Sequence, residues 1–161
     1  MTEITRLDTE KNNERTTDID ILSTEGILQK INAEDQSVAK VVEKCIPQIS
    51  NLVDEIVERI RNGGRLFYIG AGTSGRLGIL DAAECPPTYG VDNNLVIGVI
   101  AGGNDAMFVA QEGAEDSMDL PVIDLSSYHF CEKDVLIGLA ASGRTPYVIG
   151  GLKFGQEVGA L

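Results

Sequence analysis

The sequence has no tryptophan, one histidine and three cysteines, and aromatic residues make up only 5% of its 161 residues. The cysteines, Cys45, Cys85 and Cys131, are odd in number and widely spaced, without a C-x-x-C pair. This pattern predicts neither a disulfide framework nor a zinc site and is typical of a reducing cytosol. The single histidine, His129, has no metal ligands clustered around it, so we expect a surface or loop residue and no metal site.

Basic residues are also few. The chain has 13 lysine and arginine residues against 25 aspartate and glutamate residues, and its formal net charge is −12. So acidic a surface repels phosphate backbones and anionic headgroups, which argues against nucleic acid or membrane partners. No apolar run approaches the roughly 20 residues of a membrane span. Residues 1–20 are too charged and polar for a signal peptide, so we expect a cytoplasmic protein.

Glycine is plentiful, and its most informative cluster is residues 70–76, of sequence GAGTSGR. This cluster lies between an apolar run and a helix-like run, which predicts a strand, a tight loop and a helix. Glycines let the backbone approach a ligand closely, and the N–H groups at a helix start favour an anion. A phosphate is the anion that this arrangement favours. Its candidate ligands are Gly72, Thr73, Ser74 and Gly75.

Nucleotide-binding loops fit this stretch only in part. Gly70, Gly72 and Gly75 satisfy G-x-G-x-x-G, but the dinucleotide fingerprint also needs an acid after the next strand to hold a ribose. The next apolar run, residues 95–100, ends in Ala-Gly-Gly instead. A Walker loop is excluded because Gly-Lys-Ser/Thr does not occur, and a kinase loop because no lysine-bearing strand follows.

A second loop of the same kind follows the apolar run 135–141. It continues into Pro146, which suits the first turn of a helix. In a parallel sheet both loops lie at the carboxyl ends of strands, where open α/β folds bind ligands. Two hydroxyl-bearing loops at one crevice fit a compact phosphosugar better than a dinucleotide, although the second loop also reads as an ordinary helix N-cap. Its candidate ligands are Ser142, Gly143, Arg144 and Thr145.

The N-terminal part of the chain is predicted to be polar and helical. We assign residues 1–34 to a polar segment with a short helix at 23–32. Asp35 then begins a long helical pattern whose apolar residues keep the spacing of one buried face. Pro47 is expected to kink this helix or split it in two.

Residues 35–161 are predicted to form an α/β domain with a parallel sheet flanked by helices. Strand-like and helix-like runs alternate up to a last helix that finishes at Gly159, and this alternation implies parallel strands with right-handed crossovers. Only three strands can be counted, and such a sheet leaves an edge open. We therefore expect that a longer protein or a partner covers this edge.

Two acidic residues are candidates for catalysis. Glu84 closes the helix after the first loop, and the prolines at 86 and 87 are expected to make a rigid exit that fixes its carboxylate. Glu115 lies after the helix that follows Gly102 and Gly103. Paired carboxylates can act as base and acid in a proton abstraction and elimination beside a carbonyl. Because most of the 25 acids must be solvated, spacing alone leaves these roles as hypotheses.

Several longer motifs follow one another along nearly the whole chain from about residue 14. They are LST at 22–24, INAED at 31–35, GGRL at 63–66, GAGTSGRLG at 70–78, DAAECPPTYG at 81–90, IAGG at 100–103, EGAEDS at 112–117 and AASGRTPY at 140–147. Together they resemble the N-acetylmuramic acid 6-phosphate etherase family. The resemblance implies the sugar isomerase fold, a Rossmann-like parallel sheet flanked by helices that binds phosphosugars. Family members are longer, so the chain resembles their N-terminal half.

The resemblance implies a carbon–oxygen lyase of bacterial cell-wall recycling and amino sugar catabolism. Such an enzyme removes D-lactate from N-acetylmuramic acid 6-phosphate by elimination from the ring-opened sugar, and water then adds to give N-acetylglucosamine 6-phosphate. Glu84 matches the family's catalytic acid, and Glu115 matches its second catalytic carboxylate. The resemblance implies no metal or organic cofactor, and a homodimer with sites near the subunit boundary. We expect little activity from this length of chain alone, because the other half of the pocket is absent from it.

Two other classes use the same fold. One is a regulator that binds phosphosugars and controls a sugar kinase without chemistry of its own. The other comprises aldose–ketose isomerases and transcriptional sensors. The presence of both Glu84 and Glu115 favours the etherase, and no DNA-binding helix pair is visible in the sequence.

Overall fold

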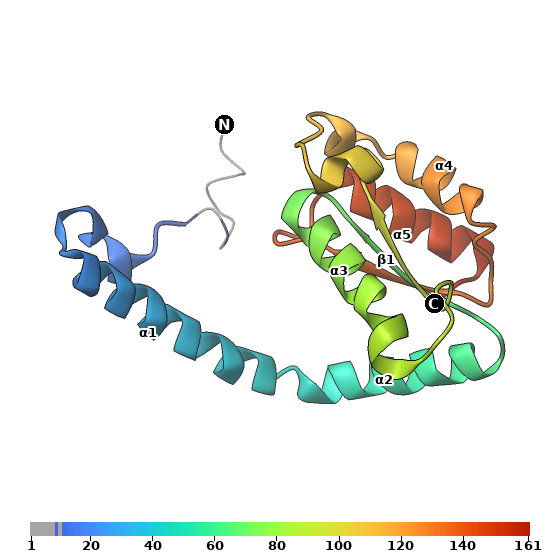
Figure 1. Cartoon of the computed structure of the whole chain (residues 1–161), viewed down its shortest axis with the longest axis horizontal. Coiled ribbons are helices and arrows are strands. Elements are labelled where there is room, and N and C mark those ends of the chain that lie inside the picture. Colours follow the sequence, from blue (N-terminus) through green and yellow to red (C-terminus); the bar gives the residue numbers. More distant parts are fainter. Residues whose placement is uncertain (1–8, 10) are drawn as a thin grey trace. The chain divides into compact units, whose positions relative to one another are not determined.

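The computed structural model describes residue 9 and residues 11–161 (Figure 1). The chain divides into two compact units, and the division lies between Asp54 and Glu55. The expected division after residue 34 stays a prediction. Within the described residues, no helix combines the length and the apolar character that crossing a bilayer requires.

The first unit is helical. Two short 3-10 helices, η3 (Glu14–Thr16) and η4 (Ile19–Ile21), precede the long helix α1 (Thr24–Glu43). The Ser23 hydroxyl caps α1 by accepting a hydrogen bond from the backbone N–H of Gly26. Such a cap satisfies one of the N–H groups that a helix start leaves without a partner.

Two ion pairs tie the 3-10 helices to α1. The Arg15 guanidinium binds the Glu34 carboxylate, and Lys30 binds Asp18. The hydrogen bonds from Arg15 and then Asn13 lower the pKa of Glu34 to about 2. Because both pairs lie at the protein surface, we expect them to orient these segments more than to stabilise the fold.

The boundary between a short and a long helix near residue 34 was wrongly predicted. Helix α1 runs unbroken through residues 32–35, which contain no glycine or proline to stop it. The break comes at Lys44 and Cys45, and α2 (Ile46–Arg61) then begins with Pro47 in its first turn. A proline is tolerated there because the first N–H groups of a helix have no intrahelical acceptor.

The predicted buried face of these helices is also wrong. Neither α1 nor α2 has a buried residue; most of the apolar stripe is exposed, and Ile56 and Ile60 are half-buried. The stripe includes Val38, Val41, Val42, Ile49, Leu52 and Val53.

The second unit contains the predicted parallel sheet, which confirms the α/β fold class. Its strands are β1 (Leu66–Gly70), β2 (Val96–Ile100) and β3 (Val135–Leu139). Strand β1 lies in the middle, and both of its neighbours pair with it in parallel. The strands are rich in valine, isoleucine and leucine, as expected of a sheet covered on both faces.

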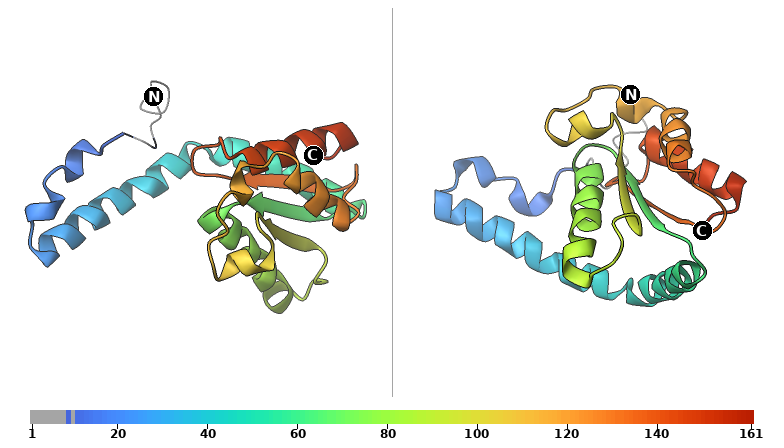
Figure 2. Two further views of the ribbon diagram at one scale, coloured as in Figure 1. Left: turned by 90° about the horizontal axis from the view of Figure 1, so that it is seen from above. Right: turned by 45° about the vertical axis from the view of Figure 1, so that its right-hand side comes forward.

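Helices cover the two faces of this sheet. Figure 2 shows α3 (Gly72–Tyr89) on one side and α5 (Pro146–Val158) on the other. Helix α4 (Leu120–Ser127) packs beside α5. Helix α5 ends at Val158, next to the predicted end at Gly159, and the left-handed backbone of Gly159 caps it. Two 3-10 helices, η5 (Asn104–Met107) and η6 (Ala114–Asp116), lie between β2 and α4.

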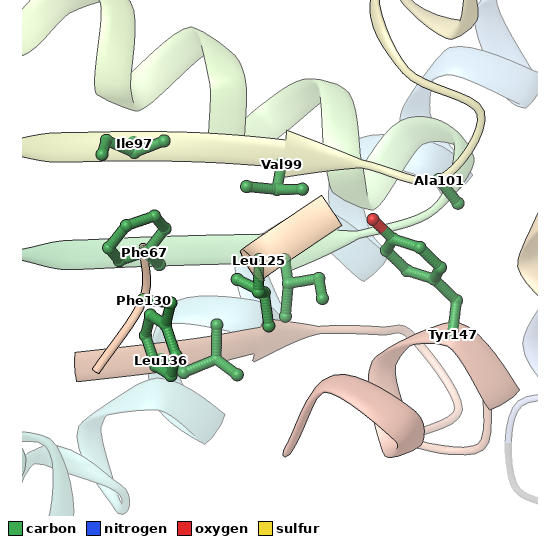
Figure 3. Packing of buried hydrophobic residues seen from close by; sticks show 9 residues of the cluster. Phe67, Ile97, Val99, Ala101, Leu125, Phe130, Leu136 and Tyr147 are labelled. Carbon is green, nitrogen blue, oxygen red and sulfur yellow. The ribbon is translucent and has the colours of Figure 1, made fainter. Parts of the chain in front are cut away.

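The core lies between the sheet and the α4–α5 side (Figure 3). Phe67 of β1 is fully buried and meets Phe130 edge to face, with ring centroids 5.1 Å apart. Tyr147 is also fully buried, and its hydroxyl donates a hydrogen bond to the Asp124 carboxylate. The other members of the cluster are Ile69, Ile97, Val99, Ala101, Leu125 and Leu136.

The last residue of the chain pairs with β3. The Leu161 N–H donates to the Asp134 carbonyl at 3.2 Å, and the Leu136 N–H donates to the Leu161 carbonyl at 2.8 Å. These two bonds, which flank Val135, form the pattern of a parallel bridge. The chain therefore ends against the outer edge of β3.

A buried ion pair fixes the starts of β1 and β3. Asp134 is 1% exposed, and its carboxylate accepts hydrogen bonds from the Arg65 guanidinium, the nearest at 2.7 Å. The backbone N–H groups of Arg65 and Cys131 donate to it as well, at 2.9 and 3.1 Å. Burial raises the pKa of Asp134, but these hydrogen bonds and the charge of Arg65 outweigh burial and leave the pKa below its ordinary value.

We expect Asp134→Asn to lower the free energy of unfolding by about 2 kcal/mol at pH 7. Breaking a fully buried pair costs about 3–5 kcal/mol, but Arg65 keeps some access to water and Asn can still accept a hydrogen bond. Because the folded pKa is depressed below 3.8, the pair stabilises the fold above that pH and its contribution falls as pH drops through the folded pKa. Urea unfolding of both proteins should therefore show a smaller difference in the free energy of unfolding at pH 3 than at pH 7. A larger difference at pH 3 would contradict the stabilising role of the Asp134–Arg65 pair.

Candidate functional site

The two predicted loops lie at the same edge of the sheet. Residues 71–75, which include the first turn of α3, follow β1, residues 140–145 follow β3, and these two strands are neighbours. The chain leaves β1 through α3 on one face, and it enters β3 after α4 on the other face. The carboxyl ends of β1 and β3 thus flank a topological switch point, which is where open α/β sheets bind ligands.

Close contact between β1 and α3 explains the glycines of the first loop. A Cβ added at Gly75 would lie 2.8 Å from the Gly70 carbonyl oxygen and 2.6 Å from Ile100. Gly72 begins α3 with a φ of +53°, a value that side chains disfavour. No side chain caps this helix start, so its first N–H groups are available to an anion.

The second loop is a tight turn before α5. Gly143 has a φ of +67°, and the Ser142 hydroxyl accepts a hydrogen bond from the Arg144 backbone N–H at 3.3 Å. Thr145 precedes α5 without capping it through its side chain, and Pro146 is the first residue of the helix, as the sequence predicted. The Ser142 contact shows that this hydroxyl already supports the turn.

A pocket of about 130 Å³ lies beside the first loop. Of the predicted site residues, it brings together Gly72 and Glu115. Neither Glu84 nor any other predicted ligand, from residues 73–75 and 142–145, lines it. Its complete lining is Ala71, Gly72, Arg76, Ala101, Ala106, Ala110, Gln111, Glu112 and Glu115.

Glu84 lies elsewhere on α3, and the helix end predicted after it is wrong. The helix continues through Pro86 and Pro87 to Tyr89, where Gly90 adopts a left-handed conformation and its N–H donates to the Pro86 carbonyl at 2.8 Å. The prolines remove two N–H donors without stopping the helix, because their fixed φ is compatible with helical backbone. Glu84 is exposed, and its position is about 18 Å along the axis from Gly72 at about 1.5 Å per residue.

Glu115 lies in η6 and is exposed to solvent at the pocket. Arg76, on the second turn of α3, also lines this pocket and is half-buried. The Arg76 Nε donates to the Met107 carbonyl at 3.1 Å, so the arginine also ties α3 to the end of η5. The pocket therefore combines one cationic side chain, the carboxylates of Glu112 and Glu115, and walls of alanine and glycine.

Burial raises the pKa of two side chains, Cys85 and Tyr68. It raises the pKa of the Cys85 thiol, and the neighbouring charge of Asp81 adds to this effect. Burial, followed by a hydrogen bond with Asp81, raises the pKa of Tyr68 to about 12. Both groups are therefore protonated at neutral pH, and neither is a base. Among the described residues, no group of three His, Cys, Asp or Glu side chains is arranged to hold a metal ion.

Residues 48–156 match the family described as "Glucokinase regulatory protein N-terminal SIS domain". This match covers more than half of the chain and most of the unit that contains the sheet. The chain belongs to this SIS domain family. The match agrees with the parallel sheet and with the sugar isomerase fold that the sequence motifs implied.

Several curated relatives of this SIS domain chain are named N-acetylmuramic acid 6-phosphate etherase. One from Clostridium beijerinckii is 60% identical over 155 residues, which are 96% of this chain and 51% of the relative. "N-acetylmuramic acid 6-phosphate etherase 2" from Vibrio cholerae is 54% identical over 157 residues, 98% of this chain and 51% of the relative. These matches confirm the resemblance inferred from the motifs. The chain spans about half the length of the curated relatives it matches.

The sequence did not predict three polar residues of the SIS domain pocket, Arg76, Gln111 and Glu112. Arg76 had a usable signal, because it follows the glycine-rich loop and falls on the same helix start. Glu112 begins the EGAEDS motif at 112–117, but its place at the pocket, like that of Gln111, depends on how the irregular segment after β2 folds.

Proposed function

We propose that this chain forms part of an N-acetylmuramic acid 6-phosphate etherase. The observation that carries the proposal is identity of 54–60% to proteins of that name over nearly the entire chain. The pocket at the carboxyl edge of the sheet supports it, because it combines a carboxylate, an arginine and a helix start suited to an anion.

In the proposed reaction, Glu115 acts as the base. Its carboxylate takes the proton from C2 of the ring-opened sugar, beside the aldehyde, and the electron pair of the C2–H bond forms a C2–C3 double bond. The C3–O bond breaks, and its electrons leave with the lactate oxygen. Glu84 then protonates that oxygen to release D-lactate. Addition of water across the double bond, with a proton to C2 and a hydroxyl to C3, gives N-acetylglucosamine 6-phosphate.

Glu115 lines the pocket and Glu84 does not, so the proposed reaction requires an active site larger than this pocket. The pocket of about 130 Å³ is smaller than the roughly 300–1,000 Å³ of ordinary ligand sites. We propose that the active protein is a cytoplasmic homodimer in which further segments or the second subunit complete the site. The exposed apolar stripe of α1 and α2 supports an association of this kind. The proposed activity uses no metal or organic cofactor.

A direct test is to measure D-lactate release from N-acetylmuramic acid 6-phosphate. A full-length protein that contains this chain should release lactate, while the 161-residue chain alone should show little or no turnover. Absence of lactate release by a folded full-length protein would refute the etherase assignment.

A phosphosugar-binding regulator of a sugar kinase is the second candidate. It is favoured by the name of the matching family, which refers to the glucokinase regulatory protein. The same assay separates the two, because a regulator binds the sugar phosphate without releasing lactate, and an isomerase forms a ketose.

Phosphate binding by the two loops gives a further prediction. Replacing both Ser74 and Ser142 by alanine should weaken binding of N-acetylglucosamine 6-phosphate by a few kcal/mol, since each hydrogen bond to a charged group contributes roughly 1.5–3 kcal/mol. Calorimetry on the full-length protein measures this loss. Ser126→Ala, at an exposed position on α4, is the matched control and should bind normally. Unchanged affinity in the double variant would refute a role for these hydroxyls.

A further inference from the structure

Of the residues that the structure describes, Arg76 is the one cationic side chain lining the pocket that also contains Glu115. Its guanidinium is held in place, because Nε donates to the Met107 carbonyl at 3.1 Å. Among the described residues, no carboxylate oxygen lies within 4.0 Å of Arg76, and its two Nη atoms make no hydrogen bond. The guanidinium is therefore anchored at Nε and keeps both Nη groups, with their four N–H donors, for a ligand.

This arrangement fits a planar anion. With Nε engaged, the two Nη groups form the remaining edge of the guanidinium, and such an edge can bind both oxygens of a carboxylate. Glu112 and Glu115 also line the pocket, so an anion there gains attraction from Arg76 and meets repulsion from both acids. A ligand with a single carboxylate, placed against Arg76, suits this balance better than a doubly charged group.

The proposed substrate carries two anionic groups, and its chemistry separates them. The C2 proton that Glu115 is proposed to remove is adjacent to C3, which bears the lactyl ether. The phosphate is on C6, three carbons further along the sugar. Arg76 lines the same small pocket as the proposed base, which brings it near C3 and its lactyl group; Gly72, a predicted phosphate ligand, lines this pocket too, so the test must compare ligands with and without the lactyl group.

We propose that Arg76 binds the lactyl carboxylate and determines specificity for sugars that carry the lactyl ether. This inference rests on the proposed etherase function. Arg76 recognises the group that the reaction removes, while the hydroxyl-bearing loops hold the phosphate that substrate and product share. Its contact with Met107 fixes the Nε side of the guanidinium.

The test compares two ligands in a full-length protein that contains this chain. Arg76→Gln should raise KM for N-acetylmuramic acid 6-phosphate on the order of 10- to 100-fold, the effect expected from losing a hydrogen bond to a charged group. The dissociation constant for N-acetylglucosamine 6-phosphate, which has the phosphate but no lactyl group, should change by less than about twofold. Arg76→Lys keeps the charge without the paired donors and should lie between Arg76→Gln and wild type.

Arg61→Gln is the matched control. Arg61 is exposed on α2, where it pairs with Glu58, and its replacement should affect neither ligand. Equal weakening of both ligands by Arg76→Gln would overturn the proposal, since it would indicate phosphate binding or a structural role through Met107. Unchanged KM would overturn it as well. If the folded wild-type protein releases no lactate, the etherase assignment itself fails, and this inference fails with it.

Discussion

Glu84→Gln is expected to slow D-lactate release at least about a hundredfold in a full-length protein that contains this chain, the usual scale for a positioned general acid or base. Binding of the sugar phosphate should remain nearly intact, because glutamine keeps the shape of the side chain and one hydrogen-bonding oxygen. Glu115→Gln should reduce lactate release to a similar degree. Steady-state assays of lactate, together with calorimetry of product binding, measure both effects.

Isotope exchange distinguishes the two carboxylates. If Glu115 is the base, Glu115→Gln should also slow exchange of the C2 proton with deuterium from solvent. If Glu84 is the acid, Glu84→Gln should still permit some exchange while lactate departure is blocked. Glu58→Gln, at an exposed position on α2, is the control and should behave as wild type. Full lactate release by Glu84→Gln would refute the acid role.

Gly150→Ala is expected to destabilise the fold by about 3 kcal/mol, at the upper end of the usual cost of overpacking. Gly150 is buried in α5, and a Cβ there would lie 2.2 Å from the carbonyl oxygen of Met118. Because the contact is with backbone rather than with a flexible side chain, α5 and the segment before α4 must move apart to relieve it. Urea unfolding of the variant and wild type measures the loss.

Gly155→Ala provides the control on the same helix. Its Cβ would lie 3.4 Å from the nearest atom, in Leu136, which is ordinary contact. Alanine also favours helix over glycine by about 1 kcal/mol, so this variant should be as stable as wild type or more so. Equal destabilisation by both variants would show that general crowding of α5, rather than the Met118 contact, is responsible.

The elements that depend on local sequence were predicted well. The three strands and the start of α5 at Pro146 are found where the sequence placed them, but the predicted loop at 70–76 is shorter, because Gly70 ends β1 and α3 already begins at Gly72. Each has a signal within a few residues, either an apolar run or a glycine or proline that fixes the backbone. The parallel sheet followed from the alternation of these elements.

The errors concern features that neighbouring residues do not decide. Pro86 and Pro87 predicted a helix end after Glu84, but packing of α3 on the sheet carries the helix through both. The apolar stripe of α1 and α2 predicted burial, yet periodicity shows only that a face is apolar and not what covers it. Arg76 was overlooked although it directly follows the glycine-rich stretch, whereas the place of Gln111 and Glu112 at the same pocket depends on the segment from η5 to η6.

The central position of β1 also has a consequence for biosynthesis. As the ribosome extends the chain, β1, α3 and β2 emerge consecutively, and they can form the first parallel pair early. Strand β3 emerges only after η5, η6 and α4, so the other edge of β1 must wait for its partner. During that interval the backbone groups of Phe67 and Ile69 lack their final neighbour, and this edge is where a nascent chain is most exposed to incorrect pairing or to capture by a chaperone.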